Sequence, residues 1–248
     1  MSGHSKWATI KRKKGAADAK RGQLFSKLSR AIIMAAREGG ADPEANLALA
    51  NAIQKARDNS MPKDNIERAV QRGAGAGEGD AYESILYEGY GPGGVAIIAN
   101  ILTDNRNRTA SDVRHIFTKN GGSLGTPGSV AWQFDRKGVI VLEGEVDEDR
   151  LMEVALDAGA EDIADDGGQW QVTTEPAELA AVRVALDGAG FGYSSAELAM
   201  VPKSTVSLDE KDARQLLRLI DALEENDDVQ DVAANFDISE EVLEAVAG

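Results

Sequence analysis

The side chains that enzymes use most for acid–base and metal chemistry are scarce in this sequence. It contains no cysteine, which excludes disulfides, thiolate metal ligands and cysteine nucleophiles. Its 2 histidines, His4 and His115, lie far apart in the chain, and neither belongs to a metal-binding pattern such as HExxH. His115 is best interpreted as an ordinary helix residue. We therefore expect no catalytic residue, no metal site and no cofactor, and we interpret the protein as a non-enzyme.

Two other patterns have only a superficial likeness to ligand sites. Gly89–Val95 (GYGPGGV) is rich in glycine, but it matches neither common phosphate-binding loop and precedes a predicted strand, which indicates a tight turn. The acidic runs Glu143–Asp149, Ala160–Asp166 and Glu224–Asp231 lack the ligand spacing of a calcium-binding loop. They fall at the ends of predicted elements, so we interpret them as solvated surface.

Cationic side chains form the pattern that does suggest a function. The segment Gly3–Arg30 contains nine Lys or Arg residues and one acid, Asp18, although the chain has a net charge of −15. Residues 1–80 carry 15 Lys and Arg against 9 Asp and Glu, whereas residues 81–248 carry 12 against 33. This asymmetry predicts that the basic part binds a polyanion while the acidic part keeps the protein soluble. The alternative is that the basic segment pairs with the acidic body.

Two basic motifs supply candidate binding residues. Trp7, among the first cations, could stack on an unpaired base or pack into a small core. A second motif, Arg106–Arg114, lies at a predicted strand-to-helix corner, where guanidinium groups and free N–H groups suit phosphate. The alternative for this corner is solvated surface. The predicted nucleic-acid-binding residues are Lys6, Trp7, Lys11, Arg12, Lys13, Lys14, Lys20, Arg21, Lys27, Arg30, Arg106, Arg108 and Arg114.

Three helices are predicted to position the first motif. The first begins near Asp18 and ends at Gly39–Gly40, with apolar side chains on one face and cations on the other. The second begins at Asp42–Glu44, where an Asp cap precedes Pro, and directs Leu47, Ala50 and Ile53 inward. The third runs from about Pro62 to Gly73. The longest apolar run near the start, Ala31–Ala36, is too short to span a bilayer.

The pattern changes to alternating strands and helices after the glycine-rich linker Gly73–Asp80. Residues 137–202 predict the order β-α-β-β-α-β, which is ferredoxin-like. The flanking residues supply the parts of a second such unit, including a helix capped by Thr109 and a strand at Ser129–Phe134. The predicted class is α+β multidomain, with a basic three-helix bundle and two ferredoxin-like (βαββαβ) domains, one inserted into the other. The predicted boundaries are 1–78 for the basic helical domain, 79–135 and 203–248 for the discontinuous α+β domain, and 136–202 for the inserted domain.

Long stretches of the sequence resemble one known family. They are GHSKWATIKRKKGAADAKRGQLFSKLSRAI, NLALANAIQKARDNSMPKDNIERAVQRG and YEGYGPGGVAIIANILTDNRNRTASDVRHIFTKNGGSLGTPGSVAWQF, all similar to the YebC family. That family also includes the mitochondrial translational activator of cytochrome c oxidase subunit I. The resemblance implies three domains, one helical and two α+β, in a cytoplasmic protein without known catalysis. Members are commonly labelled probable transcriptional regulators that bind DNA, whereas some are implicated in relieving ribosome stalling at proline-rich stretches.

These observations predict a non-enzymatic, nucleic-acid-binding regulator of gene expression. DNA and ribosomal RNA remain alternative ligands. We favour the ribosome, because no dimerisation element follows the basic segment, whereas many DNA readers present two half-sites. We expect a cytoplasmic monomer without membrane contact, and a protein partner for its acidic domains. Two other hypotheses are a protein–protein adaptor that uses the basic helix, and an enzyme that acts on a phosphorylated ligand through Arg106, Arg108 and the glycine-rich turn.

Overall fold

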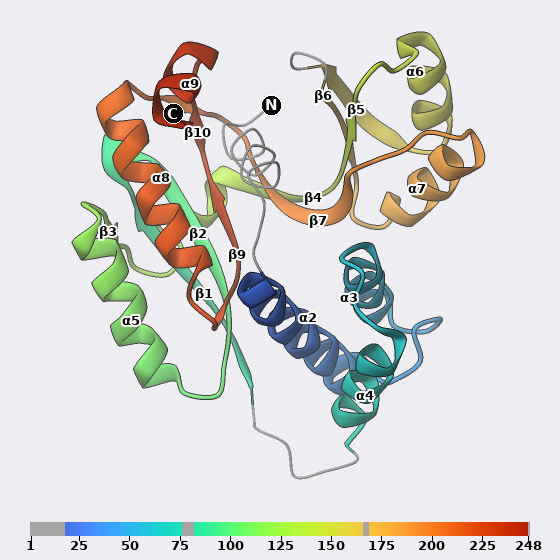
Figure 1. Cartoon of the computed structure of the whole chain (residues 1–248), viewed down its shortest axis with the longest axis horizontal. Coiled ribbons are helices and arrows are strands. Elements are labelled where there is room, and N and C mark those ends of the chain that lie inside the picture. Colours follow the sequence, from blue (N-terminus) through green and yellow to red (C-terminus); the bar gives the residue numbers. More distant parts are fainter. Residues whose placement is uncertain (1–17, 76–81, 166–168, 248) are drawn as a thin grey trace. The chain divides into compact units, whose positions relative to one another are not determined.

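The computed structural model describes residues 18–75, 82–165 and 169–247, which form two compact units (Figure 1). Residues 134–201 form one unit, and the residues before and after them form the other. The predicted class, an α+β multidomain protein with a helical N-terminal region, is confirmed. The finer domain boundaries stay predictions. None of the helices in the described part of the chain combines the length and hydropathy needed to cross a bilayer.

Three helices open the larger unit and pack on one another (Figure 1). They are α2 (Asp18–Gly39), α3 (Leu47–Asp58) and α4 (Lys63–Gly73). Their shared core contains Leu28, Ile32, Leu49, Ile53 and Ile66. Glycine is required where α4 ends against α2, because a Cβ atom on Gly73 would lie 2.5 Å from the carbonyl oxygen of Ile33. The bounds of α2 and α4 show that the first and third helices begin and end close to their predicted positions.

The predicted start of the second helix is wrong. Residues 43–45 form a turn, and α3 begins at Leu47 behind the buried Asn46. The Asn46 carboxamide oxygen accepts from the backbone N–H of Leu49 at 3.1 Å, and its nitrogen donates to the carbonyl of Ala35 at 2.7 Å. One side chain thus caps α3 and ties it to α2. The predicted inward face is also wrong at its first position, since Leu47 is exposed and Leu49 is buried in its place.

A four-stranded sheet with the order β3-β1-β2-β9 follows in the same unit. Strands β1 and β2 are antiparallel, and the turn between them at Pro92–Gly94 is where the glycine-rich loop was predicted to turn. The short strands β8 and β10 form a separate parallel pair. The elements are β1 (Glu83–Tyr90), β2 (Ala96–Thr103), α5 (Arg106–Lys119), β3 (Ser123–Leu124), β8 (Val206–Ser207), α8 (Glu210–Glu224), β9 (Val229–Ala234), β10 (Phe236–Asp237) and α9 (Glu240–Ala247).

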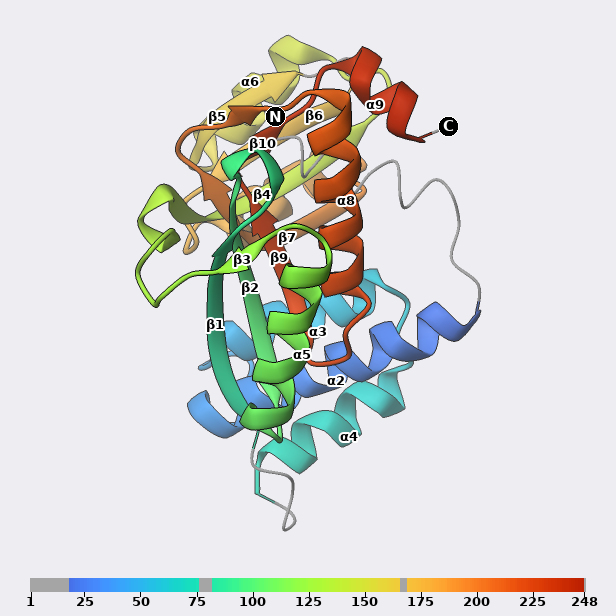
Figure 2. The same ribbon diagram turned by 90° about the vertical axis from the view of Figure 1, so that its left-hand side faces the viewer.

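Helices α5 and α8 lie side by side on one face of this sheet (Figure 2). Val113 and Phe117 of α5 join Leu216 and Ile220 of α8 in a core that includes Ile97 of β2. These five side chains are almost fully buried. The helices therefore turn their opposite faces, which carry most of their charged residues, toward solvent.

The strand predicted at Ser129–Phe134 is wrong. Residues Ala131–Gln133 form a single 3₁₀ turn, and the next strand begins at Phe134. The buried carboxylate of Glu88 accepts from the backbone N–H groups of Val130 and Ala131, both at 2.8 Å, and from that of Gly128. These donors are consequently not free for a sheet. Burial acts to raise the pKa of Glu88, but the three backbone hydrogen bonds outweigh it and lower the pKa.

The unit at residues 134–201 has a sheet of order β5-β6-β4-β7, with β6 antiparallel to both β4 and β5. This is the strand order of a ferredoxin-like βαββαβ unit. Its core contains Ile140, Leu142, Leu151, Val172 and Leu186. The elements are β4 (Phe134–Glu143), α6 (Glu148–Asp157), β5 (Ala160–Asp165), β6 (Gln169–Thr174), α7 (Leu179–Gly188) and β7 (Ser195–Pro202).

Candidate nucleic-acid interface

Some of the predicted binding residues lie in the described part of the chain and others lie outside it. Six lie outside the described residues: Lys6, Trp7, Lys11, Arg12, Lys13 and Lys14. Lys20 belongs to the first turn of α2. Arg21, Lys27 and Arg30 follow on the same helix, and the remaining arginines, Arg106, Arg108 and Arg114, all belong to α5.

The first turn of α5 is capped differently from the prediction. The helix begins at Arg106, and the cap is Asn105, whose side-chain oxygen accepts from the backbone N–H of Arg108 at 3.1 Å. Thr109, the predicted cap, is buried inside the helix. Arg106 and Arg108 therefore belong to the helix, and their side chains project from its first turn.

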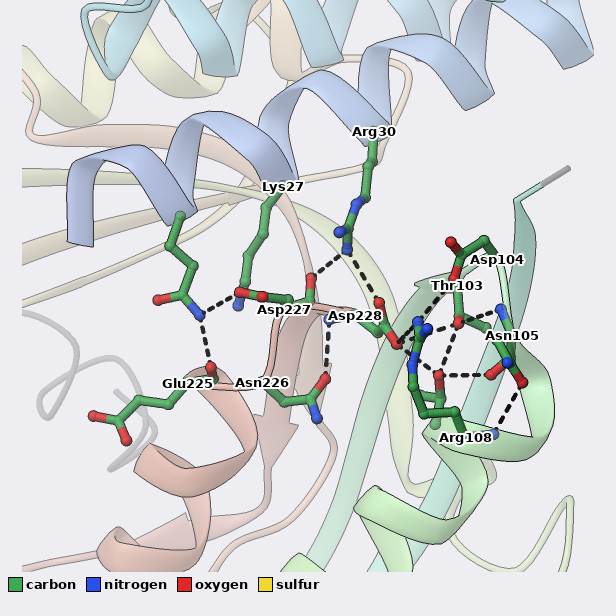
Figure 3. Close-up of polar contacts among 12 residues, drawn as sticks. Lys27, Arg30, Thr103, Asp104, Asn105, Arg108, Glu225, Asn226, Asp227 and Asp228 are labelled. Carbon is green, nitrogen blue, oxygen red and sulfur yellow. Dashed lines mark hydrogen bonds and ion pairs between the residues drawn. The ribbon is translucent and has the colours of Figure 1, made fainter. Parts of the chain in front are cut away.

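One face of α2 packs on the acidic loop between α8 and β9 (Figure 3). The Gln23 amide donates to the Glu225 carbonyl at 2.6 Å and to a carboxylate oxygen of Asp227 at 2.8 Å. Lys27 donates to the carbonyl of Glu224 at 2.6 Å. Helix α2 is thus held against the loop by side chains from successive turns.

Arg30 extends this contact to Asp228. Its Nη1 donates to the carbonyl of Asp227 at 2.7 Å and to Oδ1 of Asp228 at 3.2 Å. Its guanidinium also lies over the ring of Tyr82, with Cζ 5.7 Å from the ring centre. The side chain of Arg30 is 22% exposed, so little of it remains available to a ligand.

Asp228 also binds the start of α5 (Figure 3). Its Oδ2 accepts from Arg108 at 3.1 Å, from Thr109 at 2.7 Å and from Thr103 at 3.2 Å. Burial acts to raise the pKa of Asp228, but the hydrogen bonds from Thr109 and Arg108 and the charge of Arg108 outweigh it and lower the pKa. The pKa of Arg108 is raised by its hydrogen bonds to Asp104 and Asp228. The carboxylate is therefore kept ionised between two arginines.

These contacts separate six of the predicted binding residues into two groups. Lys27, Arg30 and Arg108 are engaged with the acidic loop, which is the internal pairing that the sequence left as an alternative. Arg21, Arg106 and Arg114 are exposed, and none of them has an ion pair with another described residue. The second group can neutralise an external anion without breaking a contact. The first group positions α2 against α5.

Asp228 was not singled out by the sequence. It lies in the run Glu224–Asp231, which we interpreted as solvated surface, and that interpretation is wrong for this residue because its side chain is only 8% exposed. Asp227 beside it is exposed. Neighbouring acids in one loop look alike in sequence, so only the chain path around Asp228 distinguishes it.

An exposed aromatic side chain was also missed. Trp132 is 68% exposed, and its ring N–H donates to the carbonyl of Ser129 at 3.1 Å. The Tyr90 hydroxyl donates to the same carbonyl at 3.2 Å. An exposed indole is a surface on which an unpaired base can stack. Its exposure was not predicted, because the alternating residues around Trp132 are typical of a strand.

Two family models and several known proteins match this chain, and together they span all of its described residues. The family model described as "TACO1/YebC protein N-terminal domain" matches residues 5–76, and "TACO1/YebC second and third domain" matches residues 82–236. A "Probable transcriptional regulatory protein" of Rubrobacter xylanophilus is 67% identical over 250 residues, covering 100% of both chains. "Probable transcriptional regulatory protein GSU1074" of Geobacter sulfurreducens is 56% identical over 244 residues, covering 98% of this chain and 99% of its own.

A solved structure is similar as well. The chain is 49% identical to the "Conserved Hypothetical Protein Aq1575 from Aquifex Aeolicus", with a TM-score of 0.82. The match covers 91% of this chain and 94% of that one. The arrangement of helices and sheets described above therefore agrees with an experimentally determined fold.

Proposed function

Because the chain belongs to the TACO1/YebC family, we propose that it is a non-catalytic regulator of gene expression that binds the phosphate backbone of a nucleic acid in the cytoplasm. The name of its relatives, probable transcriptional regulatory protein, supports the regulatory role. The residues that contact phosphate in this proposal are Lys6, Lys11, Arg12, Lys13, Lys14, Lys20, Arg21, Arg106 and Arg114, with Trp7 as a stacking residue. Lys27, Arg30 and Arg108 complete the set. Lys27 also donates to the carbonyl of Glu224, and Arg30 and Arg108 also bind the carboxylate of Asp228.

The observation that carries the proposal is the convergence of both basic motifs at one carboxylate. Arg30 comes from the first motif and Arg108 from the second, and both bind Asp228. Arg106 lies in the same helical turn as Arg108. The two motifs, far apart in sequence, are consequently neighbours, so that a single polyanion can contact both.

The acidic part of the chain has a role in this mechanism. Residues 81–248 carry 33 Asp and Glu against 12 Lys and Arg, so a polyanion repels most of their surface. Repulsion of this kind favours one orientation of approach, with the cationic segment toward the phosphates. The acidic surface is then free for a protein partner.

A salt titration tests the proposal. If about six phosphates are neutralised, the slope of log K against log salt is about −5 for duplex DNA and about −4 for a single strand. Lys11→Gln/Lys14→Gln should make the duplex slope shallower by about 1.8. The matched control is Arg136→Gln/Arg183→Gln, which removes two cations outside the proposed surface. A slope near zero for the unaltered protein would contradict the proposal.

The kind of nucleic acid is decided by a second experiment. Crosslinking in cells, followed by sequencing of the bound nucleic acid, recovers ribosomal RNA if the protein acts in translation and promoter DNA if it acts in transcription. We propose ribosomal RNA. Enrichment of promoter DNA without ribosomal RNA would exclude that choice and retain the phosphate-binding surface.

A second candidate is a protein–protein adaptor. One observation favours it, since Lys27 and Arg30 of α2 already pair with an acidic protein surface, that of the loop Glu224–Asp228. An adaptor that used the basic helix in this way would ignore RNA and DNA even at low salt. The salt titration therefore separates the two candidates.

A further inference from the structure

A groove outside the interface described above lies between the C-terminal end of α5 and the outer face of α8. Its volume is about 710 Å³. Four cationic side chains line it: Lys119, Lys211, Arg214 and Arg218. Residues 81–248 contain only 12 Lys and Arg, so a third of the cations in the acidic part of the chain gather at this one place.

Two acids, Asp209 and Glu210, also line the groove, and both already have partners within the chain. Asp209 caps α8, and its carboxylate accepts from the backbone N–H of Asp212 at 2.8 Å. Glu210 pairs with Arg214 at 2.9 Å. Among the described residues, nothing forms an ion pair or hydrogen bond with the side chain of Lys119, Lys211 or Arg218. Three exposed cations thus line the groove without an ion pair to any described residue, in a chain that has 42 acids.

The wall of the groove is closely packed where the two helices meet. Gly121 follows α5 with a φ of +77°, and a Cβ atom there would lie 2.1 Å from the side-chain nitrogen of Gln215. Only glycine therefore allows the Gln215 amide to lie against the end of α5. The Asn120 amide donates to the carbonyl of Ile116 at 2.8 Å and closes the same helix end. The lining side chains consequently project from a fixed backbone.

The spacing of the cations suits a chain of phosphates. Lys211 and Arg218 lie seven residues apart on α8, which is two helical turns or about 10 Å. That length exceeds a single phosphate and matches a short stretch of nucleic-acid backbone. Arg218 can also bind phosphate oxygens through two N–H groups at once.

Helix α5 connects the groove to the interface. Arg106 in its first turn belongs to the proposed nucleic-acid surface, and Lys119 in its last turn lines the groove. The two residues are about 20 Å apart along the helix, a distance that about six nucleotides of one strand cover. A strand that contacts Arg106 is therefore long enough to reach the groove.

We propose that this groove is a second binding site, which takes the sugar–phosphate backbone of the same nucleic acid without reading its bases. The site rests on the proposed function, because it holds a strand whose first contacts are the N-terminal cations and α5. It adds phosphate contacts from the acidic part of the chain. It also fixes the direction in which the strand leaves α5.

The test measures binding of a fluorescein-labelled 20-nucleotide oligouridylate by fluorescence anisotropy at several salt concentrations. The groove variant is Lys211→Gln/Arg218→Gln, and the control is Arg136→Gln/Arg183→Gln. We expect the slope of log K against log salt to become shallower by about 1.4 in the groove variant, or about 0.7 for each phosphate contact. The control should match the unaltered protein. Thermal unfolding of both variants establishes that they remain folded.

The possible results distinguish failure of the groove site from failure of the proposed function. If the groove variant has the same slope as the unaltered protein, the groove does not bind the nucleic acid and this proposal is wrong. An acidic protein segment would then be the alternative occupant of the groove, and the proposed function would stand. Complete absence of binding by the unaltered protein at low salt would overturn both. A shallower slope in the groove variant alone supports the site, since the control removes the same charge.

Discussion

Arg30 and Arg108, from helices far apart in the sequence, bind the two oxygens of one carboxylate, Asp228, at 3.2 and 3.1 Å. The side chain of Asp228 is 8% exposed, whereas that of Arg108 is 49% exposed. A half-exposed arginine gains little from an ion pair alone, because water screens it. The hydrogen bonds that Thr103 and Thr109 give to the same buried carboxylate make the contact structural.

We expect Asp228→Asn to lower the free energy of unfolding by about 1–3 kcal/mol, because a buried acceptor of charged and hydroxyl donors is lost. We also expect the affinity for single-stranded RNA to increase, since Arg30 and Arg108 lose their internal counter-charge. Chemical denaturation and anisotropy measure the two effects. Glu225→Gln is the control, because this exposed side chain lies in the same loop and only its backbone carbonyl is used. Unchanged stability in Asp228→Asn would contradict the role given to the carboxylate.

The pH dependence of stability follows from the lowered pKa of Asp228. A carboxyl group whose pKa is lower in the folded protein than its ordinary value of 3.8 stabilises the fold above that ordinary value. This contribution is lost as the pH falls through the folded pKa. We therefore expect the difference in unfolding free energy between the unaltered protein and Asp228→Asn to stay constant from about pH 7 to pH 5 and to shrink below about pH 4. A difference that grows in acid would show that the sign is wrong.

The exposed arginines of α5 should affect binding without affecting stability. Arg106→Gln/Arg114→Gln removes two side chains that have no ion pair among the described residues, so thermal unfolding should be unchanged while the salt dependence for duplex DNA becomes shallower by about 1.8. Arg108→Gln is the comparison, since it removes a partner of Asp228 and should lower the thermal midpoint. If both variants lose stability equally, the separation into exposed and engaged arginines fails.

Packing of the N-terminal helices can be tested with a pair of glycines. Gly73→Ala places a Cβ atom 2.5 Å from the carbonyl oxygen of Ile33 and 2.7 Å from the Cβ of Ala36, so the helices must separate. We expect a loss of about 1–3 kcal/mol, the usual cost of overpacking. Gly22→Ala is the matched control, because nothing lies within 4 Å of its added Cβ on α2, and it should raise stability by up to about 1 kcal/mol. Equal effects of both substitutions, measured by thermal unfolding, would contradict this contact.

Sequence patterns were reliable where one helix or strand depends on its own residues. The period of Leu28 and Ile32 predicted the buried face of α2, and the glycines at its end predicted where it stops. The βαββαβ order of residues 137–202 was predicted in the same way and agrees with the observed strand order. Predictions were wrong where a distant side chain intervenes. Asn46 caps α3 and also forms a hydrogen bond with α2. Glu88 of β1 accepts hydrogen bonds from the backbone of a segment whose sequence is typical of a strand.

Local sequence patterns were enough to predict the α+β class, the helical N-terminal region, the segregation of charge and the two basic motifs. Which of the cations are engaged within the protein became visible only in the folded chain. Periodicity and local composition report how a residue sits on its own helix or strand, whereas an ion pair depends on where the chain path brings separate elements together. Lys27, Arg30 and Arg108 contact the acidic loop Glu224–Asp228 because the fold brings α2 and α5 together at this loop. For the same reason, the groove beside Lys119 and Arg218 exists only once α5 and α8 lie side by side.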